Sequence, residues 1–316
     1  MKSERSSAST AVPVDGVVLL DKPRGMTSNG ALQAVRRLFG GVKAGHTGTL
    51  DPLATGLLPL CLGEATKYAS GLLEADKTYE ATIRLGVATT TGDAEGEAVF
   101  RGEIAGCFER VPAILAEFTG EIDQLPPMFS ALKHQGRPLY SYARAGEEVE
   151  RRTRRVTVRA LELLSPIGPE LKVRVLCSKG TYIRALAQDI GARLGCGAHL
   201  TALCRTAIGR LAIVEAVTLD CLESLPATER LDWLRPVDLL VSDLQSVVLD
   251  TPRAEAILQG RPVDIAHSLS PGPVRIYAAD GAFLGLGIGS EGRRLAPKRM
   301  RAGSQSMGAA AGCDVA

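Results

Sequence analysis

The sequence lacks a long apolar run. None of its apolar stretches reaches the ~18 residues that a membrane-spanning helix needs, and residues 1–14 contain no hydrophobic segment of a secretory signal peptide. This excludes a membrane-spanning protein, and we expect a cytoplasmic one. The length of 316 residues predicts a large core and more than one domain.

Patterns of cysteine and histidine that hold disulfides or metals are also missing. Seven cysteines form no C-x-x-C pair, and their odd number argues against a complete disulfide framework. The histidines, four in all, are too scattered for the spacing of a zinc site. We therefore expect reduced thiols and no metal.

The chain carries no large excess of charge of one sign. Its net charge is only +2, so a nucleic-acid partner would have to be held by local basic clusters. The sequence contains three such clusters, which are Arg36, Arg37 and Lys43, then Arg151, Arg152, Arg154, Arg155 and Arg159, then Arg293, Arg294, Lys298, Arg299 and Arg301. A solvated protein face gives the same pattern, so the clusters alone do not decide.

The most distinctive stretch is GHTGTLDPLATGLLP, from Gly45 to Pro59. Asp51 is the only carboxylate between Asp21 and Glu64. Gly45 and Gly48 permit positive φ and close approach of a ligand, and Pro52 favours an extended Asp51. The stretch predicts a fixed carboxylate beside a gap of ligand width.

Two other interpretations of this stretch stay open. Asp51 followed by Pro52 is also a good helix start, with Asp as the N-cap. Residues 40–47 read GGVKAGHT, which is one residue away from a phosphate-binding loop, with His46 in place of the lysine. A helical pattern before the glycines disagrees with that loop, because a phosphate loop follows a strand.

Periodicity predicts the elements around this stretch. We expect strands at 16–20, from Tyr79 to 85 and at 171–177, and helices from Ser28 to Gly40, from Pro112 to about Gly120 and from about Thr181 to Gly195. Residues 125–133 hold too many prolines for regular structure and, with the second basic cluster, suggest an exposed flap. Beyond Asp238 a short helix at 252–258 and a hairpin around Asp280-Gly281 suggest a small β domain.

Tyr182 and Arg184 lie near the start of the helix expected after Thr181, off its apolar stripe. Position alone favours an exposed tyrosine and a surface arginine. If Arg184 instead faces Asp51, charge pairing would keep that carboxylate ionised.

These segments together resemble the bacterial tRNA pseudouridine-55 synthase family, the TruB type. The matching stretches are GVVLLDKPRGMTS at 16–28, GHTGTLDPLATGLLPLCLGEATK at 45–67, KTY at 77–79, PPMFSALK at 126–133, RPLYSYARAGEEVER at 137–151 and SKGTYIRALAQDIG at 178–191. They cover most of residues 15–210, whereas the end of the chain matches loosely.

The resemblance implies an α+β fold and a domain order. By this resemblance, we expect a catalytic domain at 14–238 with a bent, mixed and mainly antiparallel sheet and an RNA-binding flap near 125–155. A small PUA-like β domain at 239–300 follows, between disordered tails at 1–13 and 301–316. The resemblance further implies a monomer, with no cofactor and no obligate protein partner, that converts one uridine of the tRNA T loop to pseudouridine.

The resemblance also implies roles for single residues. Asp51 would be the catalytic aspartate, Arg184 its partner and Tyr79 the aromatic residue against the flipped base. The substrate-binding set would be Lys22, His46, Tyr182, Leu203, Arg152 and Arg155, with His46 helping to open the T loop. The family usually has Leu-Arg-Arg where Leu203-Cys204-Arg205 stands, so we expect one weaker basic contact.

Two other functions remain open for the sequence. One is a non-catalytic RNA-binding protein on the same scaffold, with Asp51 as a cap. The other is a magnesium-dependent nucleotide hydrolase with its phosphate loop at Gly40 to Thr47.

Overall fold

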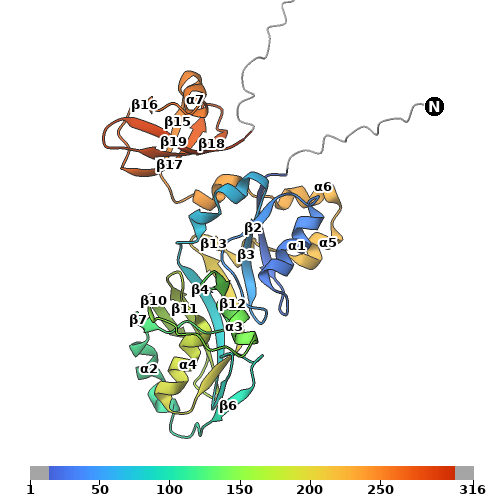
Figure 1. Ribbon diagram of the computed structural model, residues 1–316, viewed down its shortest axis with the longest axis vertical. Helices are drawn as coiled ribbons and strands as arrows, with labels where there is room; N and C mark the ends of the chain where they lie inside the picture. The colour runs from blue at the N-terminus through green and yellow to red at the C-terminus, as the bar shows by residue number, and fades with distance from the viewer. Residues whose placement is uncertain (1–13, 303–316) are drawn as a thin grey trace, which may run out of the picture.

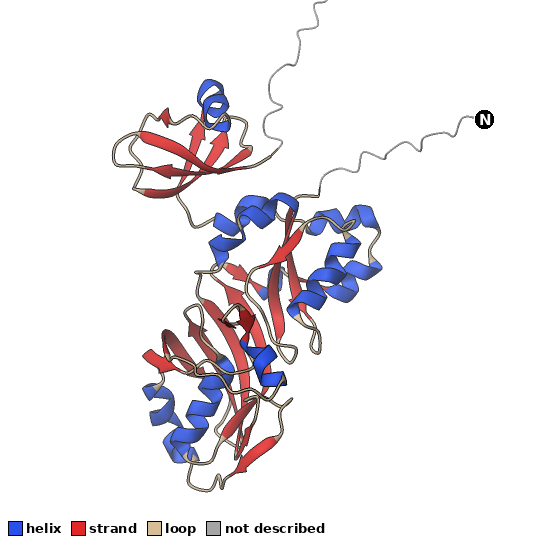
Figure 2. Ribbon diagram, viewed as in Figure 1, coloured by secondary structure: helices blue, strands red, loops and turns tan. Residues whose placement is uncertain are grey.

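The computed structural model describes residues 14–302 (Figures 1 and 2). The tail expected at 1–13 lies outside these residues, as does all but Arg301 and Ala302 of the tail expected at 301–316. Within residues 14–302, no helix is both long and apolar enough to cross a membrane.

The elements fall into strands, α-helices and short 3₁₀ segments. The strands are β1 Gly16–Lys22, β2 Ala44–His46, β3 Thr55–Leu62, β4 Lys77–Leu85, β5 Val87–Thr89, β6 Ala98–Arg101, β7 Gly120–Gln124, β8 Lys133–His134, β9 Arg137–Pro138, β10 Arg154–Leu163, β11 Glu170–Cys177, β12 Ala198–Ile208, β13 Leu211–Ala212, β14 Val217–Thr218, β15 Ser246–Leu249, β16 Val263–Asp264, β17 Gly272–Ala278, β18 Phe283–Gly289 and β19 Arg294–Met300. The α-helices are α1 Ser28–Leu38, α2 Val111–Glu117, α3 Leu139–Arg144, α4 Ile183–Leu194, α5 Leu219–Ser224, α6 Ala227–Arg230 and α7 Thr251–Leu258. The 3₁₀ segments are η1 Gly63–Lys67, η2 Ala69–Leu72, η3 Phe108–Arg110, η4 Ile213–Glu215, η5 Leu231–Trp233 and η6 Val237–Val241.

One large sheet organises most of the described chain. Its main path runs β14-β1-β3-β12-β4-β11-β10-β7, with β2 paired to β3 and β13 paired to β12. The pairs β1/β14 and β3/β12 are parallel and the others along this path are antiparallel. The predicted α+β class with a mixed, mainly antiparallel sheet is therefore confirmed.

Strands β1 and β3 are buried on both faces because most of their side chains are apolar. In β1, Val18 and Leu20 pack into the core that includes α1, whereas Val17 and Leu19 pack on the opposite side against η1, η2 and η6. The second half of the sheet has one apolar face. In β4, Ala81 and Ile83 are buried in the core that α4 covers, and Arg84 between Ile83 and Leu85 is exposed. Figure 1 shows α1 and α4 at different ends of the sheet.

Several predicted elements are confirmed. The apolar stripe of α4 is buried, and Gly195 ends the helix with φ of +82°. The hairpin of β17 and β18 turns at Asp280-Gly281 as expected. Ser28 also has a side chain that could cap the helix expected after it, but the N-cap of α1 is Thr27, whose hydroxyl accepts from the Gly30 N–H, and Ser28 is the first helical residue.

The segment predicted as a flap leaves the large sheet after β7 and returns to it at β10. Residues 125–132 contain no helix or strand, and the β8/β9 hairpin and α3 follow. We call residues 125–153 the flap. Because Gln124 ends β7 and Arg154 begins β10, the base of the flap is fixed in the sheet at both ends.

A second sheet near the end of the chain has the order β15-β17-β18-β19-β16. It lies apart from the flap in Figure 1 and contacts the region of η1, η2 and η6. Tyr68 packs edge-on against Phe283 with ring centroids 5.3 Å apart, and Tyr277 donates a 2.6 Å hydrogen bond to Asp238. These contacts join the two sheets through buried aromatic side chains.

Candidate active site

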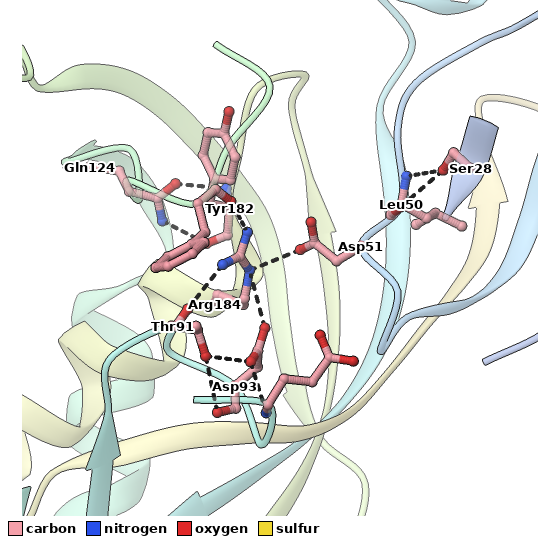
Figure 3. Close-up of polar contacts among 10 residues, drawn as sticks. Ser28, Leu50, Asp51, Thr91, Asp93, Gln124, Tyr182 and Arg184 are labelled. Carbon is pink, nitrogen blue, oxygen red and sulfur yellow. Dashed lines mark hydrogen bonds and ion pairs between the residues drawn. The ribbon is translucent and has the colours of Figure 1, made fainter. Parts of the chain in front are cut away.

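The loop that carries Asp51 connects β2 to β3 and is held by hydrogen bonds on both sides of Asp51. The Ser28 hydroxyl donates to the Leu50 carbonyl at 2.9 Å and accepts from the Leu50 N–H at 2.7 Å (Figure 3). On the other side of Asp51, the Pro52 carbonyl accepts from the Gly25 N–H at 2.7 Å. No helix begins at Asp51, so the alternative of a helix cap is wrong.

One glycine of this loop has the conformation that the sequence predicted and the other does not. Gly48 has φ of +82°, a left-handed conformation that costs other residues strain. Gly45 lies in β2, and its φ is not positive. Strand pairing with β3 keeps Gly45 extended, so Gly45 does not use the left-handed conformation that glycine permits.

Arg184 joins Asp51 to two other segments of the chain (Figure 3). Its Nε donates to Asp51 Oδ2 at 2.8 Å, Nη1 donates to the Thr91 carbonyl at 2.9 Å, and Nη2 donates to the Phe129 carbonyl at 2.6 Å. Its side chain is only 4% exposed, whereas that of Asp51 is 37% exposed. Arg184 is therefore a buried anchor, not the surface arginine that helical position alone favoured.

A second carboxylate shares the same guanidinium. Asp93 Oδ2 lies 3.7 Å from Arg184 Nε, and its Oδ1 accepts from the Thr91 hydroxyl at 2.5 Å and from the Glu95 N–H at 3.1 Å. Asp93 is buried and fully engaged, whereas Asp51 is open to solvent on one side. The two acids thus differ in exposure, and Asp51 is the more accessible of the two carboxylates.

The protonation of Asp51 is set by opposing effects. Removal from water raises its pKa above the ordinary 3.8, the positive charge of Arg184 opposes that rise, and Asp93 adds to it. Lys22 also opposes it, although burial lowers the pKa of Lys22 itself to about 8. The Lys22 ammonium is fully buried and donates to the Pro23 and Met26 carbonyls, so it acts on Asp51 by charge without contact.

Asp51 and Arg184 line two neighbouring cavities. The first cavity has a volume of about 350 Å³, and its walls include Tyr79, Tyr182 and Leu203. The second cavity has a volume of about 480 Å³ and is lined by residues that include His46. Flap residues Ser130 and Ala131 border both. The carboxylate is therefore placed where a ligand could span two hollows.

The predicted site residues that line the cavities are divided between the two of them. Tyr79, Tyr182 and Leu203 lie in the wall of the first cavity and His46 lies in the second, where its ring Nδ1 is buried without a hydrogen-bond partner in the described chain. Burial lowers the pKa of His46, which favours the neutral imidazole.

The two predicted arginines of the flap region lie outside both cavities. Arg152 is exposed beside a third hollow under the flap. Arg155 is exposed in β10 and pairs with Asp123 at 3.3 Å and Glu121 at 3.8 Å. They are therefore available to a ligand much larger than the cavities.

Three site residues were missed by sequence reasoning. Asp93 carries the second carboxylate, buried Gln124 binds both backbone groups of Tyr182 at 2.7 and 3.0 Å, and Arg205 lines the first cavity while 1% exposed. The only available signal was the polarity of Gln124 and Arg205 within strand-like segments. It could not tell a buried side chain from an exposed one.

The described residues contain no group of three or more histidine, cysteine or acidic side chains that could hold a metal ion. The phosphate-loop alternative also fails, because Gly40 to Thr47 follows α1 and leads into β2, with no helix after the glycines. The nucleotide hydrolase is thus not supported by the geometry.

Comparison with known families decides the identity. Residues 36–183 match the N-terminal domain model of TruB family pseudouridylate synthases, and residues 184–245 and 246–300 match two C-terminal domain models of the same enzymes. Over 287 residues the chain is 58% identical to a tRNA pseudouridine synthase B of Aromatoleum aromaticum, which covers 91% of this chain and 92% of that one. The chain belongs to the TruB family of tRNA pseudouridine synthases. It is an isomerase that converts uridine to pseudouridine in tRNA.

Other relatives agree with membership of the TruB family. A tRNA pseudouridine synthase B of Burkholderia mallei is 55% identical over 293 residues, with 91% of this chain and 97% of that one covered. Among solved structures, a chain from a Cbf5-Nop10-Gar1 complex superposes with a TM-score of 0.67 at 27% identity, covering 90% of this chain and 84% of that one. A chain from an H/ACA RNP bound to a substrate RNA containing 2′-deoxyuridine gives 0.66 at 25% identity, covering 90% and 84%.

Proposed function

We propose that this enzyme modifies the uridine at position 55 in the T loop of tRNA, by flipping the base out of the loop and exchanging its C–N glycosidic bond for a C–C bond. The observation that carries the proposal is the Asp51 carboxylate at the junction of two cavities, held at 2.8 Å by a buried arginine. A base inside a folded loop cannot reach such a carboxylate, so it must leave the stack at a cost of roughly a few kcal/mol.

The reaction is an isomerisation that needs no external oxidant. The C1′–N1 bond breaks, the base turns, C1′ bonds to C5, and the C5 proton is lost while N1 gains one. Asp51 starts this by attacking the ribose or the base, or by abstracting a ribose proton, and each route requires the ionised carboxylate. The Arg184 guanidinium stabilises the negative charge of Asp51. The Thr91 and Phe129 carbonyls hold the guanidinium in place.

The two cavities divide the nucleotide between them. The first cavity takes the flipped pyrimidine, where Tyr79 stacks on its face, worth roughly 1–3 kcal/mol, and Tyr182 and Leu203 complete the wall. The second cavity takes the neighbouring part of the loop, where the neutral His46 offers a hydrogen bond instead of an ion pair.

The surrounding surface positions the RNA without reading its sequence. Arg152 and Arg155 contact phosphates next to the flap, and the second sheet adds a further surface of the PUA-like kind. Loop shape and the flipped base supply selectivity. We further propose that the enzyme acts on tRNA as a cytoplasmic monomer without a protein partner or cofactor.

The test is to map pseudouridine in unmodified tRNA transcripts treated with the purified chain. We expect a single modified position, 55, and equal modification of an isolated T stem-loop. Modification elsewhere would refute the assigned position, and a chain that binds tRNA without modifying it would support the non-catalytic RNA-binding alternative.

A further inference from the structure

Arg205 is a fully buried cation in the wall of the first cavity. It lies in β12, directly opposite Tyr79 of β4, so the two side chains share one face of the sheet. Its Nε donates to the Leu57 carbonyl at 2.8 Å and its Nη2 donates to the Gly48 carbonyl at 3.2 Å. The side chain is therefore fixed between the Asp51 loop and Tyr79.

The charge of Arg205 has no acidic partner among residues 14–302. Arg184, in the same wall, has Asp51 at 2.8 Å and Asp93 at 3.7 Å. Arg205 meets only backbone carbonyls and the phenol of Tyr79, and its burial lowers its pKa. A buried charge without a counter-ion is costly to folding, so its retention calls for a compensating use.

Lys77 is a second cation of this kind in the same wall. Its Nζ donates to the carbonyls of Leu72, Leu73 and Ala75, at 3.4, 2.8 and 2.6 Å. It forms no ion pair within the described chain, because Asp76 beside it pairs with Arg159. Lys77 and Arg205 both line the cavity that holds Tyr79. This part of the cavity therefore carries net positive charge before any ligand enters.

We propose that Arg205, supported by Lys77, supplies the positive charge that stabilises the pyrimidine ring when it leaves C1′ with the bonding electron pair. The inference rests on the proposed placement of the flipped base against Tyr79. When the C1′–N1 bond breaks, both electrons stay on the base, and the negative charge spreads over N1 and the two ring carbonyl oxygens. The charge disappears again when C5 bonds to C1′, after which C5 loses its proton and N1 gains one.

Geometry favours the departing base over an RNA phosphate as the group that this charge serves. Two of the guanidinium nitrogens of Arg205 are committed to the Leu57 and Gly48 carbonyls, and the side chain is 1% exposed. It therefore cannot form the exposed, bidentate clamp by which arginine binds a phosphate. A fixed charge beside the stacking tyrosine acts on charge that develops during the reaction, where preorganised electrostatics are most effective.

Substrates with different leaving groups test this role. Arg205→Gln and Lys77→Gln are compared with the wild type in single-turnover reactions on T stem-loops that carry uridine or 5-fluorouridine at the target position. Fluorine withdraws electrons and makes the base a better leaving group, so the missing charge matters less. Consumption of the starting nucleoside is followed by chromatography of nuclease digests.

We expect Arg205→Gln to lower the single-turnover rate on the uridine substrate on the order of 10²-fold. The fold-loss on the 5-fluorouridine substrate should be smaller by a factor of about ten or more, and the RNA affinity should be unchanged. Arg205→Lys, which keeps the charge, should recover most of the rate. Arg210→Gln, which removes an exposed arginine beyond the end of the same strand, is the matched control and should change neither rate.

Equal slowing of both substrates by Arg205→Gln would overturn the inference and leave Arg205 as a purely structural tie. If that variant fails to fold, Lys77→Gln decides, since it should show a smaller loss with the same difference between substrates, and equal losses would again overturn it. Failure of the proposed function is distinct, because the wild type would then not form pseudouridine in the T loop.

Discussion

At the scale of single residues, Asp51 is poised between burial, which favours its neutral form, and Arg184, which favours the charged one. Removal from water is the larger effect, so its pKa stands above 3.8 in the free enzyme. In the proposed mechanism, the reaction requires the ionised form of Asp51. Activity is therefore present above the raised pKa of Asp51 and is lost as the pH falls through it.

This predicts the acid limb of the pH–rate profile. In the wild type the single-turnover rate should fall at a higher pH than an ordinary aspartate would give. Arg184→Gln removes a charge that lowers the pKa of Asp51, so the limb should move to still higher pH and the maximal rate should fall sharply. Rates measured between pH 4 and 8 check this, since an unmoved limb in the variant would separate Arg184 from the ionisation of Asp51.

Asp93 has the opposite electrostatic effect and a structural task. Asp93→Asn removes a negative charge that raises the pKa of Asp51, so the acid limb should move to lower pH. The rate at pH 7.5 should still fall roughly tenfold or more, because Arg184 loses its second ion pair. The pH–rate profile of Asp93→Asn measures both the position of the acid limb and the rate at pH 7.5. A shift of the limb toward higher pH would contradict the effect of Asp93 on the pKa of Asp51.

At the scale of elements, the Asp51 loop depends on one hydroxyl of α1. Ser28→Ala removes both hydrogen bonds to Leu50 and leaves two buried backbone groups without this partner. We expect a loss of about 1–3 kcal/mol in the free energy of unfolding and a slower chemical step with little change in RNA affinity. Ser224→Ala, at an exposed position of α5, is the control and should change neither quantity. Chemical denaturation and single-turnover rates would show the difference.

The regular elements could largely be predicted from the sequence because their signals are local. The buried stripe of α4 and its Gly195 stop, or the Asp280-Gly281 turn, depend on residues close in the chain. The N-cap of α1 could not be predicted from the sequence, because Thr27 and Ser28 are both good N-cap residues. Ser28 is diverted to Leu50 by a contact between residues 22 positions apart.

The partners of Asp51 were predicted less well, because they too come from segments far apart in the chain. The pairing of Asp51 with Arg184 was suggested through family resemblance, since position on the helix favoured solvent. Asp93 gave no sequence signal, and the polarity of Arg205 within a strand did not show that it is buried. The positions of both arise only when the turn after β5, strand β12 and the Asp51 loop meet in space.

At the scale of the whole molecule, the flap contacts the active site through the Phe129 carbonyl and through Ser130 and Ala131, which border both cavities. Phe129 in the flap accepts from Arg184, and Gln124 at the flap base holds Tyr182. The basic residues at the end of the flap then extend the interacting surface beyond the cavities. In the proposed function, RNA held by this surface would be directed toward Asp51.

Salt dependence of tRNA binding tests that surface. Arg152→Ala and Arg155→Ala together should weaken binding most at low salt and reduce the slope of log affinity against log salt by roughly 0.7–0.9 for each phosphate that the variant no longer neutralises. Arg84→Ala, which removes an exposed arginine of β4 paired with Glu170, is the control. Filter binding across salt concentrations would show an unchanged slope if these side chains do not bind phosphate.

The most direct test of the account is the single-turnover rate of Asp51→Asn on a T stem-loop, with bound RNA measured in the same samples. We expect pseudouridine formation to fall on the order of 10³-fold or more while folding and RNA affinity match those of the wild type. Asp220→Asn at an exposed position of α5 should leave the rate unchanged. Pseudouridine formation by Asp51→Asn at the wild-type rate would contradict the central claim that this carboxylate carries the reaction.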